Sequence, residues 1–326
     1  MFIYIGGISP SPPPTTINED MRKYLNNDNG FIEQKEWFPH CWVSVECPDK
    51  SDYDFLTSDL RIPPSFLESI ADADERPRME HDGGWKLTIL RIPLHRDDGD
   101  SPYITVPLGI ITSNEIIVTV CYHYTELIPD FIAHTHARGI SINNEADFIL
   151  RIMYSAAFWF LRYLRDINRS VSGASKNLEK SIRNRELIDM MRLQKALVYF
   201  NTSISGDEML ITSIRRVYGD CYDPDLLEDV DIEIKQAGNT VNVYTDILSG
   251  MLDSFASIIS NNVNDIMKKM TGVSIVLMIP TLVASFYGMN VAITYGAQPW
   301  VFFAIVGGSL FLSFIVFFIL RHNRWL

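Results

Sequence analysis

The C-terminal end of the chain contains a long stretch without a single charged side chain. Residues 270–320 include no Asp, Glu, Lys, Arg or His. Two apolar segments lie within this stretch, 271–287 and 300–320, and the second is long enough to cross about 30 Å of hydrocarbon as a helix. A buried core helix would also be apolar, but an uncharged stretch of this length favours a hairpin of two membrane spans. The chain is therefore expected to fold partly within a bilayer.

Basic residues stand on the outer side of each apolar segment. Lys268 and Lys269 precede the first segment, Arg321 and Arg324 follow the second, and the connecting loop 291–299 is uncharged. Because cytoplasmic flanks carry an excess of Lys and Arg, both termini are expected in the cytoplasm. The N-terminus has neither a basic n-region nor a long apolar h-region, so no signal peptide is expected. These features predict a multi-pass protein of the inner or plasma membrane.

The remaining composition limits the classes of function. The formal net charge of −12 repels nucleic acid and attracts cations. Four scattered cysteines form no C-x-x-C pair, so they are expected to be reduced thiols. The chain contains no G-x-S-x-G, Walker loop or H-E-x-x-H sequence. We therefore expect neither an enzyme nor an organic cofactor, and without an ATP-binding motif any transport must run down a gradient.

The N-terminal part has the alternation of an α/β domain. Four segments are rich in β-branched and apolar residues and are predicted to be strands: 40–48, 84–94, 103–111 and 115–122. The last two are separated by Thr-Ser-Asn, which favours a hairpin turn. The segment 63–77 begins with prolines that suit a helix N-terminus, and the predicted helix ends before Pro77.

Long helices are predicted from about residue 144 onward, where Gly and Pro become rare. Apolar residues recur there with helical spacing, at Phe148, Ile149, Ile152, Met153, Phe160 and Leu164. A second helical run covers 178–217, and a third begins near Asp225. The third contains no proline before Pro280, so it is expected to enter the membrane as one continuous rod of ~80 Å.

These patterns predict six consecutive regions. A cytoplasmic α/β domain is followed by a long-helix stalk or funnel, a pore-lining span, an extracytoplasmic loop, a second span and a basic tail. Their predicted bounds are 1–143, 144–269, 270–290, 291–299, 300–320 and 321–326.

The polar residues of the first apolar segment repeat every seven positions. Two sets interleave: Asn264, Thr271, Met278 and Ser285, and Met267, Ser274, Thr281 and Gly288. A 3.5-residue repeat is typical of a helix that faces the axis of a bundle of its own copies. Packing through small residues would also place Ser, Thr and Gly on one face. The methionines, however, are larger than such tight contacts favour.

The repeat continues on the cytoplasmic side of the span. We call the whole set the polar seam; it consists of Asp253, Ser257, Ser260, Asn264, Met267, Thr271, Ser274, Met278, Thr281 and Ser285. Its length favours a water-filled path over tight helix packing. Because two spans of one chain cannot enclose a channel, a pore requires several copies around an axis.

A neutral amide, Asn290, follows the outer end of the seam. A ring of amide oxygens accepts hydrogen bonds from the water shell of a divalent cation without removing that shell. This suits Mg²⁺, which dehydrates reluctantly. Gly288 is expected to permit the backbone bend that ends the helix.

The sequence Tyr-Gly-Met-Asn at 287–290 resembles the signature of the CorA family of divalent cation channels. It follows a Pro-containing apolar helix and precedes a short loop, a second span and a basic tail. The segment 239–253, NTVNVYTDILSGMLD, is similar to the same family, and a weaker similarity extends back through FLESIADADERPR. The resemblance implies a homopentamer in the lipid bilayer that conducts Mg²⁺, with Co²⁺ or Ni²⁺ as further ions, under the control of intracellular divalent ion.

The resemblance also assigns roles to residues of the pathway. It implies an N-terminal α/β/α domain and a stalk helix that runs into the pore helix, with the second span at the periphery. Gly288, Met289 and Asn290 correspond to the selectivity filter. Met267 and Met278 correspond to hydrophobic constrictions, and Asp253 to a charged ring lower in the pore.

A regulatory metal site is implied between neighbouring subunits. Asp229 aligns with one sensing aspartate, but Ser69 stands where its partner aspartate is expected. Glu68, Asp72 or Asp74 are the candidate substitutes. Alternatively, Asp229 belongs to a solvated helix start, where carboxylates are favoured by the helix dipole.

Two other functions remain open. One is transport of Zn²⁺, as in the zinc-transporting branch of the same superfamily. His123, His134 and His136 could suggest such a site, but a His-Thr-His sequence in a polar loop is more often an ordinary loop. The other is a membrane-anchored binding or signalling protein whose hairpin serves only as a tether. The uncharged loop 291–299 also lacks the acidic residues that would concentrate cations, which leaves weaker capture or a different ion open.

Overall fold

The chain forms two compact units, Met1–Gly250 and Met251–Leu326. The computed structural model describes residues 22–96, 99–113, 116–142, 144–180, 184–219, 221–289, 299–323 and 325. Each unit is considered by itself below.

The first unit is built on a seven-stranded sheet with the order β2-β1-β3-β7-β6-β5-β4. Only β3 and β7 are parallel; the other neighbours are antiparallel. The strands are β1 Arg22–Asn27, β2 Phe31–Gln34, β3 Trp42–Glu46, β4 Arg78–Asp82, β5 Trp85–His95, β6 Tyr103–Thr112 and β7 Ile117–Cys121. The four strands expected from the sequence are confirmed as β3, β5, β6 and β7. Strand β1 and the two edge strands, β2 and β4, were not expected.

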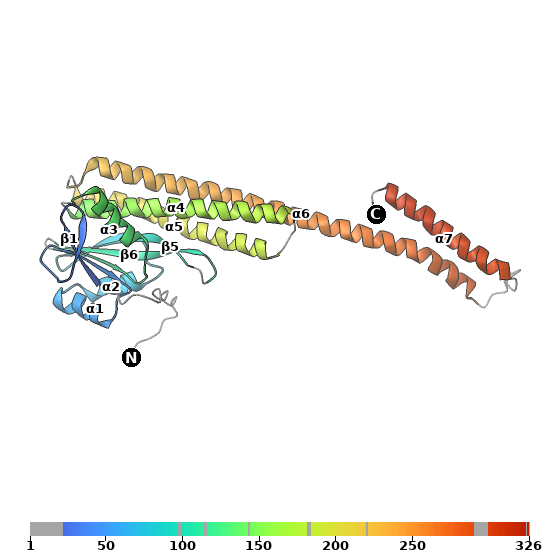
Figure 1. Ribbon diagram of the computed structural model, residues 1–326, viewed down its shortest axis with the longest axis horizontal. Coiled ribbons are helices and arrows are strands. Elements are labelled where there is room, and N and C mark those ends of the chain that lie inside the picture. Colours follow the sequence, from blue (N-terminus) through green and yellow to red (C-terminus); the bar gives the residue numbers. More distant parts are fainter. Residues whose placement is uncertain are drawn as a thin grey trace. The chain divides into compact units, whose positions relative to one another are not determined.

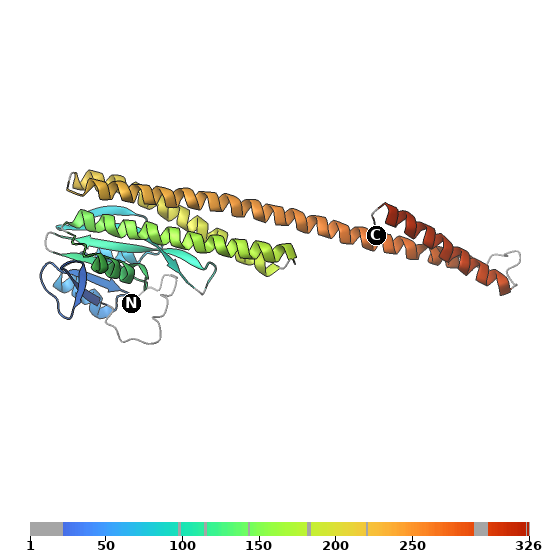
Figure 2. The same cartoon turned by 45° about the horizontal axis from the view of Figure 1, so that its top comes forward.

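Helices cover both faces of this sheet, which gives the α/β/α arrangement that the family resemblance implies (Figure 1). The helices are α1 Lys50–Asp54, which continues as the π-helical turn η1 Phe55–Asp59, α2 Pro64–Ala71, α3 Leu127–Arg138, α4 Glu145–Lys180, α5 Asn184–Tyr218, α6 Pro224–Tyr287 and α7 Pro299–His322. Helices α1 and α2 lie on one face of the sheet. The opposite face is covered by α4 and α5, with the first part of α6 beside them (Figures 1 and 2).

The side chains of β3 alternate between the two faces of the sheet and contribute to the apolar core on each side. Val43 and Val45 point toward α2 and pack with Phe66 and Ile70. Trp42 points the other way, where its ring contacts the aromatic side chains of α3 and α4 and its Nε1 donates to Thr119 Oγ1 at 2.9 Å. Successive strand residues face opposite sides of a sheet, so one short strand contributes to both layers.

The helical predictions are confirmed with one correction. The six apolar residues expected on the inner face of the first long helix are all buried in α4. Residue 178, the expected start of the second helix, lies within α4 instead, and α5 begins at Asn184. No Gly or Pro lies between residues 174 and 205 to mark the boundary. Helix α6 is continuous for 64 residues despite Pro280, about 96 Å of helix at 1.5 Å per residue.

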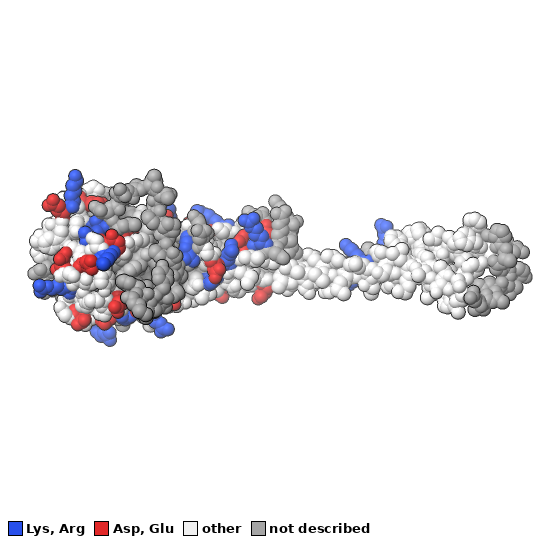
Figure 3. Space-filling view, turned by 90° about the horizontal axis from the view of Figure 1, so that it is seen from below, with Lys and Arg blue, Asp and Glu red and all other residues white. Residues whose placement is uncertain are grey.

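Two of the described helices have the length and composition of membrane spans. They are Pro224–Tyr287, of which the apolar part qualifies, and Trp300–His322. Their most apolar windows are only 6% and 11% buried. A core helix of a soluble protein would show the opposite, because its apolar side chains would be covered. Beyond the Lys and Arg side chains near the start of the span, the described surface visible in Figure 3 carries no Lys, Arg, Asp or Glu. The second unit therefore fits the predicted membrane hairpin.

Candidate ion pathway

All ten residues of the polar seam are exposed along α6. The two methionines are the clearest case, since Met267 and Met278 are each 61% exposed. Apolar side chains on other sides of the same span are exposed to a similar degree, for example Leu277 and Phe286 at 64% each, so the alignment in one row, and not the exposure, distinguishes the seam. The seam residues are brought into one row by the helix, as the sequence predicts.

Helix α7 packs on a different face of α6. A groove of about 320 Å³ between the two helices is lined by Val283 and Tyr287 from α6 and by Ile305 and Ser309 from α7. Ser309 and Ser313 of α7 are each only 7% exposed. Small side chains of this kind allow two helices to approach closely in a membrane.

The polar seam lies opposite this packing face. Thr281 precedes Val283 by two residues, and Ser285 precedes Tyr287 by two. A two-residue step turns about 200° around an α-helix. Pro280 and Ala284 also line the groove and lie about 100° from Thr281 and Ser285 around the helix. The seam therefore faces mostly away from α7, so α7 occupies a peripheral position if the seam lines a pore.

The seam hydroxyls use their protons within their own helix. Ser274 Oγ donates to the Met270 carbonyl at 2.9 Å, and Thr281 Oγ1 donates to the Leu277 carbonyl at 3.0 Å. Such bonds to the preceding turn are common for Ser and Thr in helices. A hydroxyl oxygen has two lone pairs besides its proton. These oxygens consequently present acceptors, which suit water molecules around a cation.

The first membrane helix ends at Tyr287, as predicted, but the form of the ending differs from expectation. Gly288 N–H donates to the Ala284 carbonyl at 2.9 Å, and Met289 N–H donates to the Phe286 carbonyl at 3.3 Å. The φ angle of Gly288 is not positive, so the helix does not end with a left-handed glycine. A Cβ at Gly288 would lie 3.3 Å from the Ala284 oxygen. Close approach to the last turn, and not a left-handed conformation, therefore distinguishes this glycine.

The remainder of the predicted filter and loop, Asn290 and residues 291–298, lies outside the described residues. Met289 is 54% exposed at the end of the described span. Of the basic tail, Arg321 lies in the last turn of α7, where a cation is favoured by the helix dipole. Arg324 lies outside the described residues.

The proposed sensor carboxylates do not meet within one chain. Asp229 is exposed on α6, whereas Glu68 and Asp72 are exposed on and after α2, on the opposite side of the sheet. Within the described ranges no three His, Cys, Asp or Glu side chains are grouped closely enough to hold a metal ion. A metal site that uses these residues therefore requires a second chain.

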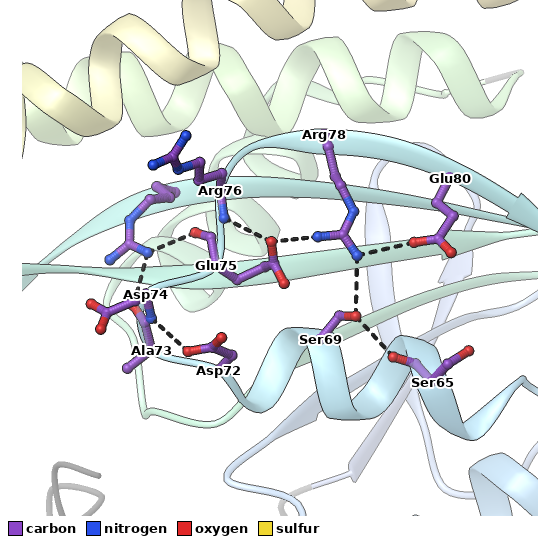
Figure 4. Close-up of polar contacts among 10 residues, drawn as sticks. Ser65, Ser69, Asp72, Ala73, Asp74, Glu75, Arg76, Arg78 and Glu80 are labelled. Carbon is purple, nitrogen blue, oxygen red and sulfur yellow. Dashed lines mark hydrogen bonds and ion pairs between the residues drawn. The ribbon is translucent and has the colours of Figure 1, made fainter.

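The Ser69 hydroxyl is hydrogen-bonded to the guanidinium of Arg78 (Figure 4). Its Oγ donates to the Ser65 carbonyl at 2.9 Å and accepts from Arg78 Nη2 at 3.2 Å. Arg78 also forms ion pairs with Glu75 and, at 3.0 Å, with Glu80. Because a guanidinium already neutralises these carboxylates, position 69 is a poor site for a divalent cation. Arg78 was not singled out from the sequence.

The segment that follows α2 is fixed by a buried arginine. Arg91 Nη1 donates to the carbonyls of Ala73 and Glu75 at 2.8 Å each, and its backbone N–H donates to Asp207 Oδ1 at 3.0 Å. Burial lowers the pKa of Arg91 and raises the pKa of the Asp207 carboxyl well above its usual value. The segment that carries Asp72 and Asp74 is thus held rigidly against β5 and α5.

The candidate zinc histidines do not converge. His134 and His136 are exposed on α3, so the expectation of a loop at this sequence is wrong. The polar composition concealed the helix, whose buried face is carried by Leu127, Phe131 and Thr135. His123 is only 8% exposed and follows β7.

Comparison with known proteins decides the family. The model of the CorA-like Mg2+ transporter protein family matches residues 39–322. The chain belongs to the CorA family. The cobalt/magnesium transport protein CorA of Methanocaldococcus jannaschii is 26% identical over 325 residues, covering 93% of this chain and 98% of that protein.

Solved structures confirm the CorA fold. The complete structure of the CorA magnesium transporter from M. jannaschii matches with a TM-score of 0.79 and 20% identity, over 95% of this chain and all of that one. The cytoplasmic domain of ZntB from Vibrio parahaemolyticus matches with a TM-score of 0.56 and 15% identity, over 74% of this chain and 97% of that domain. At such low identity the ZntB match shows a shared fold and does not indicate the ion. The expectation of a CorA-like membrane protein is confirmed.

Proposed function

We propose that the chain conducts Mg²⁺, with Co²⁺ and Ni²⁺ as further ions, through a pore lined by the polar seam of α6. Five copies arranged around an axis enclose the pore, α7 lies at its periphery, and Asn290 forms the selectivity ring with Gly288 and Met289. The Met267 and Met278 rings act as hydrophobic constrictions that empty of water when the pore closes. Both termini lie in the cytoplasm.

The observation that carries this proposal is the position of the seam opposite α7. A membrane helix that packed only against lipid and α7 would gain nothing from a 33-residue row of mostly hydroxyl, amide and carboxylate side chains. Intramembrane polar residues usually face a bundle interior or a water-filled cavity. The seam oxygens offer acceptors to a hydrated cation, and the protein's net charge of −12 attracts one.

The inside-negative membrane potential supplies the driving force for passive influx. A doubly charged ion gains about 4.6 kcal/mol per 100 mV of inside-negative potential, twice the value for one charge. Import therefore requires no ATP-binding site and no enzymatic step.

Flux measured in proteoliposomes tests the proposal. Purified protein should admit Mg²⁺, Co²⁺ and Ni²⁺ under an inside-negative potential, with Mg²⁺ preferred over Zn²⁺ at equal concentrations. Preference for Zn²⁺ would favour the zinc-transporting alternative. An absence of flux for every divalent ion, with folded protein in the vesicles, would favour a tether.

Regulation by internal Mg²⁺ should depend on Asp229. Replacing Asp229 by Ala is expected to raise, by several-fold, the internal Mg²⁺ concentration that halves the flux, because a carboxylate at a site between subunits is lost. Glu228→Ala is the matched control, since Glu228 is also exposed and lies about 100° around the same helix. Equal inhibition of both variants and the wild type would mean that Asp229 takes no part in sensing.

A further inference from the structure

A cavity of about 380 Å³ lies in the first unit and contains none of the polar-seam residues. It is bordered by β5, β6, the residues just before β6, the segment after α2, one face of α5 and His123, which lies two residues beyond β7. Its polar lining includes Arg91, Arg96, Asp100, His123 and Lys195. Cavities of 300–1,000 Å³ with a few converging polar groups are typical of small-molecule sites.

His123 is the first unusual feature of this cavity. The side chain is only 8% exposed, and neither Nδ1 nor Nε2 has a hydrogen-bond partner among the described residues. Burial and, to a lesser extent, the positive charge of Arg96 lower the pKa of His123, so the ring is neutral. A neutral imidazole has one donor and one acceptor, and a buried unsatisfied polar group costs about 1–3 kcal/mol.

Arg96 supplies a second unpaired donor. Its Nε is buried without a partner in the part of the chain that the structure describes. The backbone around it is fixed, because Arg96 N–H donates to the Pro102 carbonyl at 2.8 Å. Its guanidinium lies against Gly99, whose φ is +118° and where a Cβ would stand 2.4 Å from Arg96 Nη2. Glycine at 99 therefore allows the guanidinium to lie at the cavity wall.

The other charged groups of the lining are already engaged or balanced. The Arg91 guanidinium donates hydrogen bonds to the carbonyls of Ala73, Glu75 and Thr105. Lys195 Nζ forms an ion pair with Asp100 Oδ2 at 3.2 Å, and Asp74 is the second carboxylate. Among the described lining residues, three cationic side chains accompany the carboxylates of Asp74 and Asp100. Arg91 also lies near the carboxylates of Asp207, Asp72 and Glu75. The guanidinium of Arg96 and the two unpaired N–H groups, and not a surplus of positive charge, therefore favour an anion.

We propose that this cavity binds a small metabolite through its oxyanion, a phosphate or carboxylate group that accepts hydrogen bonds from Arg96 Nε and from the His123 ring. Arg96 provides the charge and His123 the second donor. Lys195, at the end of the lining on α5, remains paired with Asp100. The site is independent of the ion pathway and of the proposed Mg²⁺ conduction.

Titration calorimetry on the full chain in detergent tests this site. The probes are inorganic phosphate and succinate, in buffer with EDTA so that divalent ions do not contribute. At least one probe should bind saturably to the wild type, and Arg96→Gln should weaken that binding by roughly tenfold or more, as expected for loss of a hydrogen bond to a charged group. Arg138→Gln, at the exposed C-terminal end of α3, is the matched control and should bind like the wild type. Whichever probe binds more tightly identifies the class of oxyanion.

Measuring sulfate affinity as a function of pH distinguishes an anion site from a cavity that holds only water. The charge of sulfate is constant over the pH range in which histidine titrates, so any change in affinity reports on the protein. A bound anion stabilises the imidazolium form and raises the pKa of His123; affinity should therefore be highest at low pH and fall as pH rises through that pKa. His123→Gln should bind more weakly and lose this dependence, although Lys195, Asp74, Asp100, Arg91 and Arg96 remain.

Two results would overturn the proposal. One is that none of the three anions, phosphate, succinate and sulfate, binds saturably to folded wild-type protein. The other is unchanged affinity in Arg96→Gln, provided that its thermal unfolding midpoint matches that of the wild type. Arg96→Lys keeps the charge but removes Nε, so recovery of less than full affinity in this variant supports the directional hydrogen bond.

Discussion

Replacement of Ser274 and Thr281 together by leucine is expected to stop Mg²⁺ flux. Both side chains lie on the polar seam, exposed and opposite α7, and both offer hydroxyl oxygens as acceptors. Leucine in every copy would turn two rings of acceptors into apolar rings, which exclude water from a narrow pore. We expect a decrease on the order of a hundredfold in proteoliposome flux, from loss of a hydrated path.

The matched control places leucine beside the seam. Val273 and Ile275 flank Ser274 on exposed sides of the same helix turn. Val273→Leu with Ile275→Leu should leave flux close to that of the wild type, because neither position faces the proposed pore. Full flux in the seam variant, or equal loss in both variants, would show that the hydroxyl row does not line the pathway.

Replacement of Asn290 by alanine is expected to abolish selective Mg²⁺ uptake while leaving the fold intact. The amide oxygen is proposed to accept hydrogen bonds from the water shell of the ion, and a typical hydrogen bond contributes about 0.5–1.5 kcal/mol. Loss of two such contributions, from two copies around the ion, corresponds to roughly a 5- to 150-fold decrease in the rate of entry. Flux of Mg²⁺ against Na⁺ in proteoliposomes measures the effect.

Asn262→Ala is the control for this prediction. Asn262 is an exposed amide on α6 that does not belong to the polar seam. Its replacement should change neither rate nor selectivity. Normal Mg²⁺ selectivity in Asn290→Ala would refute the role proposed for that residue.

The long elements of the fold could be predicted because their patterns are long. Helix α4 repeats apolar residues over many turns, and α7 is apolar throughout, so tertiary contacts do not alter either prediction. The strands β5 and β6 are apolar and pair over their whole lengths. Short edge strands were missed because β2 and β4 are mostly polar, and their pairing is decided by neighbouring strands.

Helix α3 shows a different reason for failure. Its last turns contain two exposed histidines, and only a narrow face is buried. A stripe this narrow gives a weak periodic signal. The helix is stabilised by a contact between residues far apart in sequence. The ring centroids of Phe131 and Trp42 lie 5.7 Å apart.

The row of seam residues along α6 could be predicted from the sequence, whereas the contacts around the other candidate sites could not; that the row lines an ion pathway stays a prediction. A seven-residue repeat survives in one helix regardless of contacts, so the seam could be found from spacing alone. The engagement of Ser69 by Arg78 could not, because it depends on the distance between a helix and an edge strand. The same holds for His123 and Arg96, which the sheet brings to one cavity from separate strand ends.

Water accessibility along α6 tests the central claim most directly. Single cysteines placed at each position from 271 to 286, in a variant whose exposed Cys221 is replaced by Ser, are treated with a membrane-impermeant thiol reagent in the reconstituted protein. We predict modification at 271, 274, 278, 281 and 285, with protection by Mg²⁺, and no reaction at positions 276 and 283. Modification that shows no 3.5-residue period, or that spares those five positions, would contradict a pore lined by the polar seam.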